Sequence, residues 1–337
     1  MAYYHQIFFE RQYIMDKRQR TLHEWLKTFF SDEDFSIKPL AGDASFRRYF
    51  RVTHQNKSYV LMDAPPEKEA LTPFIDICTR LKNNHIHTPA LLNISQDLGL
   101  LLLEDFGDAL LLDCLKNHPA DGYYQAAINV LHQIQRTPYV NLPRFDATFM
   151  LQEMQLMTTW FLQGHLKLDL SNDELDMINT QFHWIASQLS HQPTVFIHRD
   201  YHARNIMVLP EETLMLGIID FQDAMIGPCT YDLVSLLKDC YIQWPRDNVL
   251  SWVQQFYQGL PTDIKPTLEQ FIHDFDLCGL QRHLKVLGIF SRLNLRDHKP
   301  GYLKDLPLTL DYTLEALSQL PECRSFYDWM KTRVKLS

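Results

Sequence analysis

Hydrophobic and polar positions follow two different periods along this chain, and the change falls near residue 105. Before that point, apolar residues alternate with polar ones or form short runs, which is typical of β-strands. After it, apolar residues recur every three or four positions, which is typical of amphipathic helices. The predicted strands of the first part cover residues 35–40, 46–52, 59–62, 89–94 and 98–103.

Helices are predicted in both parts. They cover residues 21–30, 67–83, 121–135, 149–162, 172–189, 247–260 and 263–295, and one or two more helices are predicted within 306–330. The methionine and aromatic stripe of residues 149–162 is predicted to be core, and Gly279 and Gly288 indicate close helix packing. We therefore predict an α+β protein. It would have an N-terminal extension at 1–20, a small β-rich lobe at 21–105 and a large, mainly helical lobe at 106–337.

One segment interrupts the helical part. Two apolar runs, 206–209 and 214–219, are joined by Pro210-Glu211-Glu212-Thr213, which has turn chemistry. A hairpin at this place would return Asp220 to the neighbourhood of Asn205, although fifteen positions separate them in the sequence.

Three acceptor side chains, Asp200, Asn205 and Asp220, flank this hairpin. Phosphoryl transfer needs one carboxylate to orient the attacking hydroxyl and oxygen ligands to hold Mg²⁺. Mg²⁺ keeps several waters, so two protein ligands suffice. The predicted roles are Asp200 as catalytic base, and Asn205 and Asp220 as metal ligands. The alternative is a buried hairpin with polar turn residues.

Composition narrows the class of protein. A net charge of −9 disfavours nucleic acid as a partner. The six cysteines lack zinc-type spacing and mostly lie in apolar segments, which predicts reduced thiols in a cytoplasmic protein. The first residues lack the apolar core of a signal peptide, and no run reaches the ~18 apolar residues that span a bilayer. We expect a monomer that acts on a small molecule, with no membrane partner.

The catalytic segment resembles that of the aminoglycoside-phosphotransferase-like kinases, which are relatives of the protein kinases. More closely, the chain is similar over residues 35–305 to bacterial kinases of the anomeric hydroxyl of N-acetylmuramate and N-acetylglucosamine. The motifs that carry the resemblance are His198-x-Asp200-x-x-x-x-Asn205, Ile219-Asp220-Phe221-Gln222-Asp223-Ala224, Gly227-Pro228-x-x-Tyr231-Asp232-Leu233, Met62-Asp63-Ala64-Pro65-Pro66-Glu67 and Leu102-Leu103-Glu104-Asp105-Phe106-Gly107-Asp108.

The resemblance implies a two-lobed, protein-kinase-like fold with ATP and Mg²⁺ as cofactors. It implies a nucleotide-covering loop at residues 41–45, with Gly42 and Ser45 near the phosphates. Adenine would be held by backbone groups near Glu104 and Phe106. Asp232 would hydrogen-bond the catalytic loop and hold it in shape.

The chain departs from the usual kinase pattern at one strand. Kinases carry a lysine there that holds the ATP phosphates. Residues 59–63 read Tyr-Val-Leu-Met-Asp and contain no lysine. The candidates to replace this lysine are Arg48, on the preceding strand, and Lys68, which follows the strand. For each of them, the alternative is a side chain that faces solvent and binds no phosphate.

For the acceptor sugar, the resemblance implies phosphorylation of the anomeric hydroxyl, in cell-wall recycling. His202, Arg204, Asp223 and Arg282 are the candidate substrate-binding residues, because an N-acetyl sugar needs hydrogen bonds and muramate adds a carboxylate. For Arg282, a salt-bridged or snorkelling role is the alternative. Two other functions stay open: a kinase of aminoglycosides or other small molecules, and a nucleotide-binding pseudokinase, which the missing strand lysine favours.

Overall fold

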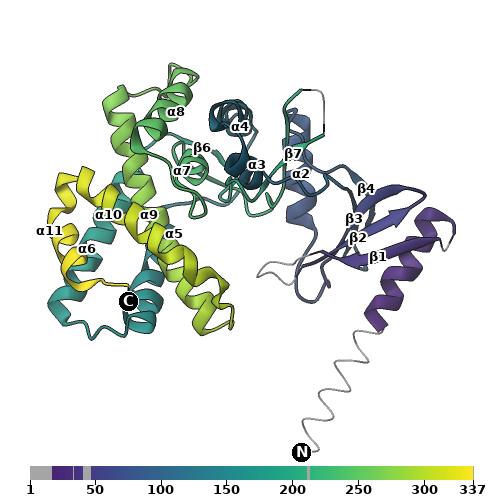
Figure 1. Cartoon of the computed structure of the whole chain (residues 1–337), viewed down its shortest axis with the longest axis horizontal. Helices are drawn as coiled ribbons and strands as arrows, with labels where there is room; N and C mark the ends of the chain where they lie inside the picture. The colour runs from purple at the N-terminus through teal and green to yellow at the C-terminus, as the bar shows by residue number, and fades with distance from the viewer. Residues whose placement is uncertain (1–16, 33, 41–46, 211–212, 337) are drawn as a thin grey trace, which may run out of the picture. The chain divides into compact units, whose positions relative to one another are not determined.

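The computed structural model describes residues 17–32, 34–40, 47–210 and 213–336. The chain forms two compact units (Figure 1). One contains Met1–Asp76 and Pro89–Gly107, and the other contains Ile77–Thr88 and Asp108–Ser337. The α+β fold class is confirmed, since a five-stranded antiparallel sheet precedes a mainly helical region.

The first unit is built on that sheet, with strand order β1-β2-β3-β5-β4. Its strands are β1 (Phe35–Pro39), β2 (Arg48–His54), β3 (Lys57–Asp63), β4 (Leu91–Ser95) and β5 (Leu100–Glu104). All neighbouring pairs are antiparallel, and the register sets Arg48 of β2 opposite Asp63 of β3. Each strand overlaps one of the predicted strands.

A helix at residues 17–30 packs on this sheet. Leu22, Trp25 and Leu26 lie at helical spacing and are buried against the sheet residues Leu61 and Leu102. Within the described residues the helix already covers residues 17–20, which precede the predicted start at residue 21. It therefore takes in the end of the segment expected to be an extension.

The predicted helix at 67–83 begins too early. In the structure α2 covers Thr72–Asn83, and turns precede it, closed by hydrogen bonds from the backbone of Lys68 and Glu69 to Pro65. Pro73 explains the difference: proline is tolerated in the first turn of a helix but breaks the hydrogen-bond ladder of its interior.

The second unit is mainly helical. It contains α3 (Leu111–Asn117), α4 (Ala120–Gln135), α5 (Ala147–Leu156), η1 (Met157–His165), α6 (Asn172–Leu189), α7 (Tyr231–Leu237), α8 (Arg246–Gln258), α9 (Leu268–Leu295), η2 (Pro300–Asp305), α10 (Leu306–Gln319), η3 (Pro321–Cys323) and α11 (Arg324–Arg333). Two antiparallel strand pairs lie among them: β6 (Thr194–Ile197) with β9 (Met225–Pro228), and β7 (Ile206–Leu209) with β8 (Met215–Ile218). No helix among the described residues is long and apolar enough to cross a membrane.

The segment predicted as one helix at 149–162 is α5 followed by the π-helix η1. Helix α9 approaches this junction very closely at Gly288. A Cβ atom there would lie 2.3 Å from the carbonyl carbon of Leu156, so only glycine fits. Gly279 differs, because its Cβ would have 3.7 Å to the nearest atom, on Val234. The prediction of close packing therefore holds for Gly288 and is wrong for Gly279.

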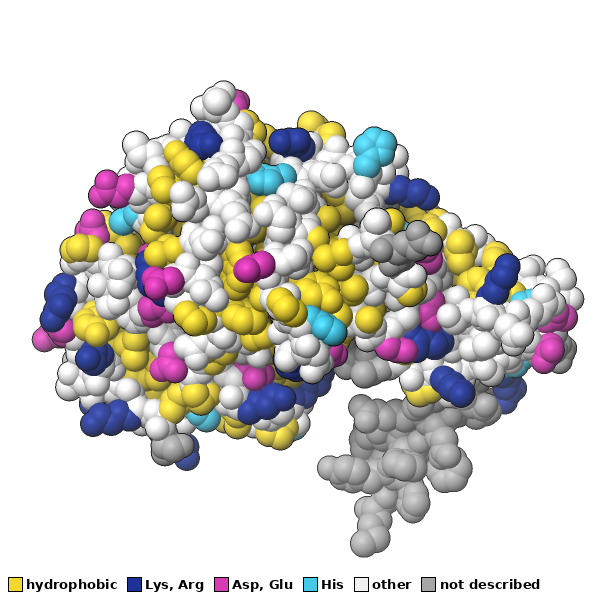
Figure 2. Space-filling view, turned by 45° about the horizontal axis from the view of Figure 1, so that its top comes forward, with side chains coloured by type: hydrophobic (Ala, Val, Ile, Leu, Met, Phe, Trp, Pro, Cys, Tyr) yellow, Lys and Arg dark blue, Asp and Glu magenta, His cyan; other side chains and the backbone are white. Residues whose placement is uncertain are grey.

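Charges of both signs are mixed on the face that Figure 2 shows. Lysine, arginine and acidic side chains alternate over the helical unit there, with no broad basic surface in view. This face therefore lacks the concentrated positive charge that binds phosphate backbones.

Candidate functional site

The loop at residues 198–205 joins β6 to β7, and tight backbone turns fold it. The N–H of His202 donates to the carbonyl of Asp200 at 3.0 Å, and the N–H of Asn205 donates to the carbonyl of His202 at 2.9 Å. We call this segment the catalytic loop. Because β7 pairs with β8 from Ile206 opposite Ile218, the end of β8 comes back to the end of the loop.

Asp200, Asn205 and Asp220 meet at this point. The Asn205 Nδ2 donates to Asp220 Oδ2 at 3.2 Å and to the carbonyl oxygen of Asp200 at 3.0 Å. The predicted return of Asp220 to Asn205 is therefore confirmed, whereas the roles of the three residues remain predictions. Asp220 has a φ of 63°, a left-handed conformation that costs a non-glycine residue about 1 kcal/mol or more.

Asp200 keeps its carboxylate accessible. The side chain is 41% exposed, while Asn205 is buried behind it. The surrounding protein partly desolvates the carboxylate, which opposes ionisation, but the positive charges of Lys285 and Arg282 outweigh this effect and hold the pKa of Asp200 well below its usual range. Asp200 is consequently a carboxylate at neutral pH, as an acceptor of a hydroxyl proton must be.

Asp232 supports the loop from below. It is fully buried, and its two oxygens accept the backbone N–H groups of His198 at 2.6 Å and Arg199 at 3.0 Å. Burial raises the pKa of Asp232 to about 7, against the opposing effect of these two hydrogen bonds. Arg199 adopts a φ of 75°, so Asp232 holds a backbone conformation that the chain would not choose locally.

Asp239 is a second support, and the sequence reasoning missed it. One oxygen accepts the N–H of Ala203 at 3.3 Å, and the other accepts those of Tyr241 at 2.9 Å and Ile242 at 3.0 Å. Burial raises the pKa of Asp239 to about 6. The one available signal was an acidic residue next to the apolar run of α7.

A buried charged network lies beside the loop. Glu153 of α5 accepts hydrogen bonds from Arg199 at 2.7 Å and from Gln281 at 3.2 Å, and pairs with Lys285 at 3.0 Å. The sequence reasoning missed Glu153, Gln281 and Lys285, because it assigned the stripe of α5 to the core. A charged residue within each apolar-striped helix was the signal that could have found Glu153 and Lys285.

Arg282 of α9 lies next to the catalytic loop and is buried. Its Nη1 donates to the carbonyl oxygen of Arg199 at 2.9 Å, and its Nη2 lies 3.8 Å from Asp200 Oδ1. Its guanidinium also lies over the ring of Tyr231, 5.6 Å from the centroid. These contacts connect Arg282 to the loop itself, so positioning is the role that its geometry supports directly.

The other three predicted substrate residues also lie at the loop or just after β8. The rings of His202 and Tyr241 are 5.5 Å apart, and the Arg204 guanidinium lies 4.8 Å from the centroid of the same tyrosine ring. Burial lowers the pKa of His202 to about 3, so it is neutral at neutral pH. Asp223 is exposed and accepts a hydrogen bond from Gln222 at 3.2 Å.

The oxygens of Asn205 and Asp220 fit Mg²⁺ by their chemistry. Asn205 uses its Nδ2 for both hydrogen bonds described above, which leaves its amide oxygen as a ligand beside the Asp220 carboxylate. In the described part of the chain, no group of three or more His, Cys, Asp or Glu side chains is placed to hold a metal. A hard-oxygen pair completed by waters and phosphate oxygens is how Mg²⁺ is usually held.

The predicted nucleotide residues belong to the sheet unit. Glu104 ends β5, where its N–H donates to the carbonyl of Ala90 at 3.0 Å, and Phe106 is buried. Arg48 pairs with Asp63, and Lys68 is exposed. Gly42 and Ser45 lie outside the described residues.

The fold and the loop define a class of protein. The chain belongs to the phosphotransferase enzyme family, whose model matches residues 36–267. Solved structures agree in fold: the choline kinase LicA from Streptococcus pneumoniae matches with a TM-score of 0.64 at 12% identity, covering 88% of this chain and 99% of LicA. The ADP-bound aminoglycoside phosphotransferase APH(2'')-Ib matches with a TM-score of 0.60 at 15% identity, covering 88% of this chain and 98% of that one.

Two relatives with higher sequence identity share one name. The N-acetylmuramate/N-acetylglucosamine kinase of Pseudomonas aeruginosa is 38% identical over 290 residues, which is 84% of each chain. The kinase of the same name from Neisseria meningitidis is 34% identical over 322 residues, covering 92% of this chain and 94% of the relative.

Proposed function

We propose that this protein is an ATP-dependent sugar kinase that phosphorylates the anomeric hydroxyl of N-acetylmuramate or N-acetylglucosamine. The observation that carries the proposal is the meeting of Asp200, Asn205 and Asp220, with Asp200 ionised and accessible. The names of the relatives supply the acceptor class. The product would be an amino-sugar phosphate that feeds cell-wall recycling in the cytoplasm.

Asp200 orients the attacking hydroxyl and accepts its proton late in the transfer. Its low pKa suits this role, because in a loose transition state the hydroxyl proton leaves after the phosphoryl group has begun to move. Most of the acceleration would come from positioning and from stabilisation of charge.

Asn205 and Asp220 would hold Mg²⁺, which when bound neutralises charge on the phosphates. Arg204 and His202 are the substrate contacts we propose first, since both belong to the catalytic loop. Arg282 holds the loop carbonyl of Arg199 and lies near Asp200. Its loss would therefore affect turnover more than affinity for the sugar. We propose a monomer.

Phosphorus NMR of the product tests the proposal. The protein would be incubated with ATP, Mg²⁺ and either N-acetylmuramate or N-acetylglucosamine. We expect a new phosphate resonance coupled to the anomeric proton. Phosphorylation of an aminoglycoside with no reaction on either N-acetyl sugar would contradict the acceptor, and ATP binding without turnover of any acceptor would contradict the enzyme.

A further inference from the structure

A fully buried acid lies at the end of β3, where the phosphate-binding lysine of other kinases is expected on this strand. Asp63 is 0% exposed, and both its oxygens are used. Its Oδ1 accepts Nε of Arg18 at 2.9 Å and Nη2 at 2.5 Å, and its Oδ2 accepts Nε of Arg48 at 3.0 Å and also Nη2. We call these three residues the Asp63 cluster.

The Asp63 cluster has a net charge of one positive unit, because two arginines pair with one carboxylate. One guanidinium would neutralise the carboxylate, yet two are bound to it. The Arg48 side chain is 38% exposed, and its Nη1 has no partner among the described residues. Because Arg48 reaches solvent, this excess positive charge can attract an anion.

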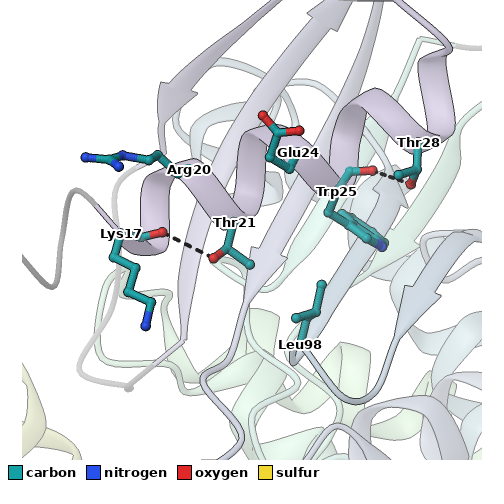
Figure 3. Close-up of a pocket in the computed structure, with 7 residues that line it drawn as sticks. All are labelled: Lys17, Arg20, Thr21, Glu24, Trp25, Thr28 and Leu98. Atoms are coloured by element: carbon teal, nitrogen blue, oxygen red, sulfur yellow. Dashed lines mark hydrogen bonds between the residues drawn. The ribbon is translucent and has the colours of Figure 1, made fainter.

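The N-terminal helix supplies Arg18 by simple periodicity. Arg18 precedes Leu22 by one turn, on the face that carries Trp25 and Leu26 into the core. Its Nη2 also donates to the carbonyl of Leu98 at 2.6 Å. Figure 3 shows Trp25 of the same helix pointing toward Leu98. This helix lies before the region that matches the family model, so Arg18 belongs to an element the family match does not include.

We propose that the Asp63 cluster binds the polyphosphate of the nucleotide, with Arg18 and Arg48 together replacing the strand lysine. The inference rests on the proposed kinase function and deepens it. Each arginine binds Asp63 through Nε and Nη2, so its permanently charged guanidinium keeps Nη1 to donate to phosphate oxygens. Asp63 is a positioning residue: it fixes both forks and, being itself an anion, does not contact the phosphate. The one lysine of β3, Lys57, lies at the other, exposed end of the strand.

The test compares Arg18→Met and Arg48→Met with Arg20→Met in the full-length chain. Arg20 lies on the same helix but lines the pocket of Figure 3 and is exposed, so it is the matched control. The measurements are KM for ATP, KM for the sugar, kcat, the melting temperature, and ADP affinity by calorimetry without Mg²⁺. Arg18→Lys is the second variant, in case Arg18→Met does not fold.

We expect KM for ATP to rise and ADP affinity to fall about 10-fold in each cluster variant, the factor for one lost charge-assisted hydrogen bond. KM for the sugar should not change, and Arg20→Met should behave as the wild type. Lower melting temperatures with unchanged ADP affinity, or a rise in KM for the sugar instead, would overturn the inference. Failure of the kinase proposal is separate: the wild type would then phosphorylate no sugar, and ADP calorimetry would still decide the role of the cluster.

Discussion

Asp63 in the sheet unit and Asp232 in the helical unit are both fully buried, but they accept hydrogen bonds from different kinds of donor. Asp63 accepts only side-chain donors among the hydrogen bonds described, the guanidinium groups of Arg18 and Arg48. Within the described part of the chain, Asp232 accepts only backbone donors, the N–H groups of His198 and Arg199. The first acid positions charges, and the second shapes the backbone.

This difference decides what each region can tolerate. An arginine side chain that loses its carboxylate partner can rotate and place its guanidinium in the solvent, because the side chain is long and, in these two cases, partly exposed. A backbone N–H that loses its acceptor stays where the fold holds it and remains unsatisfied. We therefore expect the catalytic loop to depend on its supporting acid for its conformation, and the Asp63 cluster to depend on its acid mainly for precision.

The largest expected effect is on catalysis and comes from Asp200, the proposed proton acceptor of the catalytic loop. Asp200→Ala should reduce kcat by about 10³-fold or more, while ADP affinity stays close to that of the wild type, because the contact we propose for the carboxylate is with the acceptor hydroxyl rather than with the nucleotide. Asp220→Ala is the contrast and should weaken Mg²⁺-ATP binding and turnover together. Steady-state kinetics and ADP calorimetry check both. Near-full activity of Asp200→Ala would show that the proton acceptor has been misassigned.

The second prediction tests the comparison directly. Asp232→Ala leaves two buried N–H groups without an acceptor and should lower the free energy of unfolding by about 2–4 kcal/mol. Asp63→Ala should cost less, about 1–2 kcal/mol, because its arginines can reach solvent. Asp232→Asn keeps one acceptor oxygen and should fall between the wild type and Asp232→Ala. Urea unfolding measures all three, and a larger loss for Asp63→Ala would reverse the comparison.

The third prediction concerns α9, the helix that brings Arg282 and Lys285 to the catalytic loop. Gly288→Ala places a methyl group against the backbone of Leu156 and should destabilise the protein by about 1–3 kcal/mol. Gly279→Ala has room and should be neutral or stabilise by about 0.5–1 kcal/mol, the usual gain in a helix interior. Thermal melting of the two variants provides an internal control. Equal destabilisation would mean that helix packing at Leu156 is not the cause.

The smallest effect concerns Glu174, which accepts both kinds of donor at the protein surface. It bonds the backbone of Ser171 at 2.9 Å, and Trp329 and Arg333 of α11 at 2.9 and 2.8 Å. The Ser171 hydrogen bond is the main cause that lowers the pKa of Glu174 to about 2. A carboxylate whose pKa is lowered by folding stabilises the folded state when the pH is above the pKa of the group in the unfolded chain. This contribution is lost as the pH falls through the pKa of the group in the folded chain.

The stability gap between the wild type and Glu174→Gln should therefore be constant above about pH 5 and narrow toward about pH 3. Urea unfolding at several pH values measures this gap. A gap that widens in acid would contradict the assignment.

The sequence by itself determined what local patterns encode. Alternation and turn chemistry predicted the β7–β8 hairpin, and with it the meeting of Asn205 and Asp220. Helical periodicity predicted the span of α6, 172–189, to the residue. The motif around Asp200 carried the family. Each of these signals lies within a short stretch of chain, where backbone geometry and apolar spacing are read directly.

Only the tertiary structure decided which distant charged and polar groups meet. Arg18 and Asp63 are 45 positions apart, and Gln281 and Glu153 are 128 apart. The sequence placed Arg18 in an extension and Glu153 in a core stripe, and neither period nor composition could correct this. The physical reason is that a buried charge is stable only beside its partner, and that partner is chosen by the packing of whole elements rather than by the neighbouring residues.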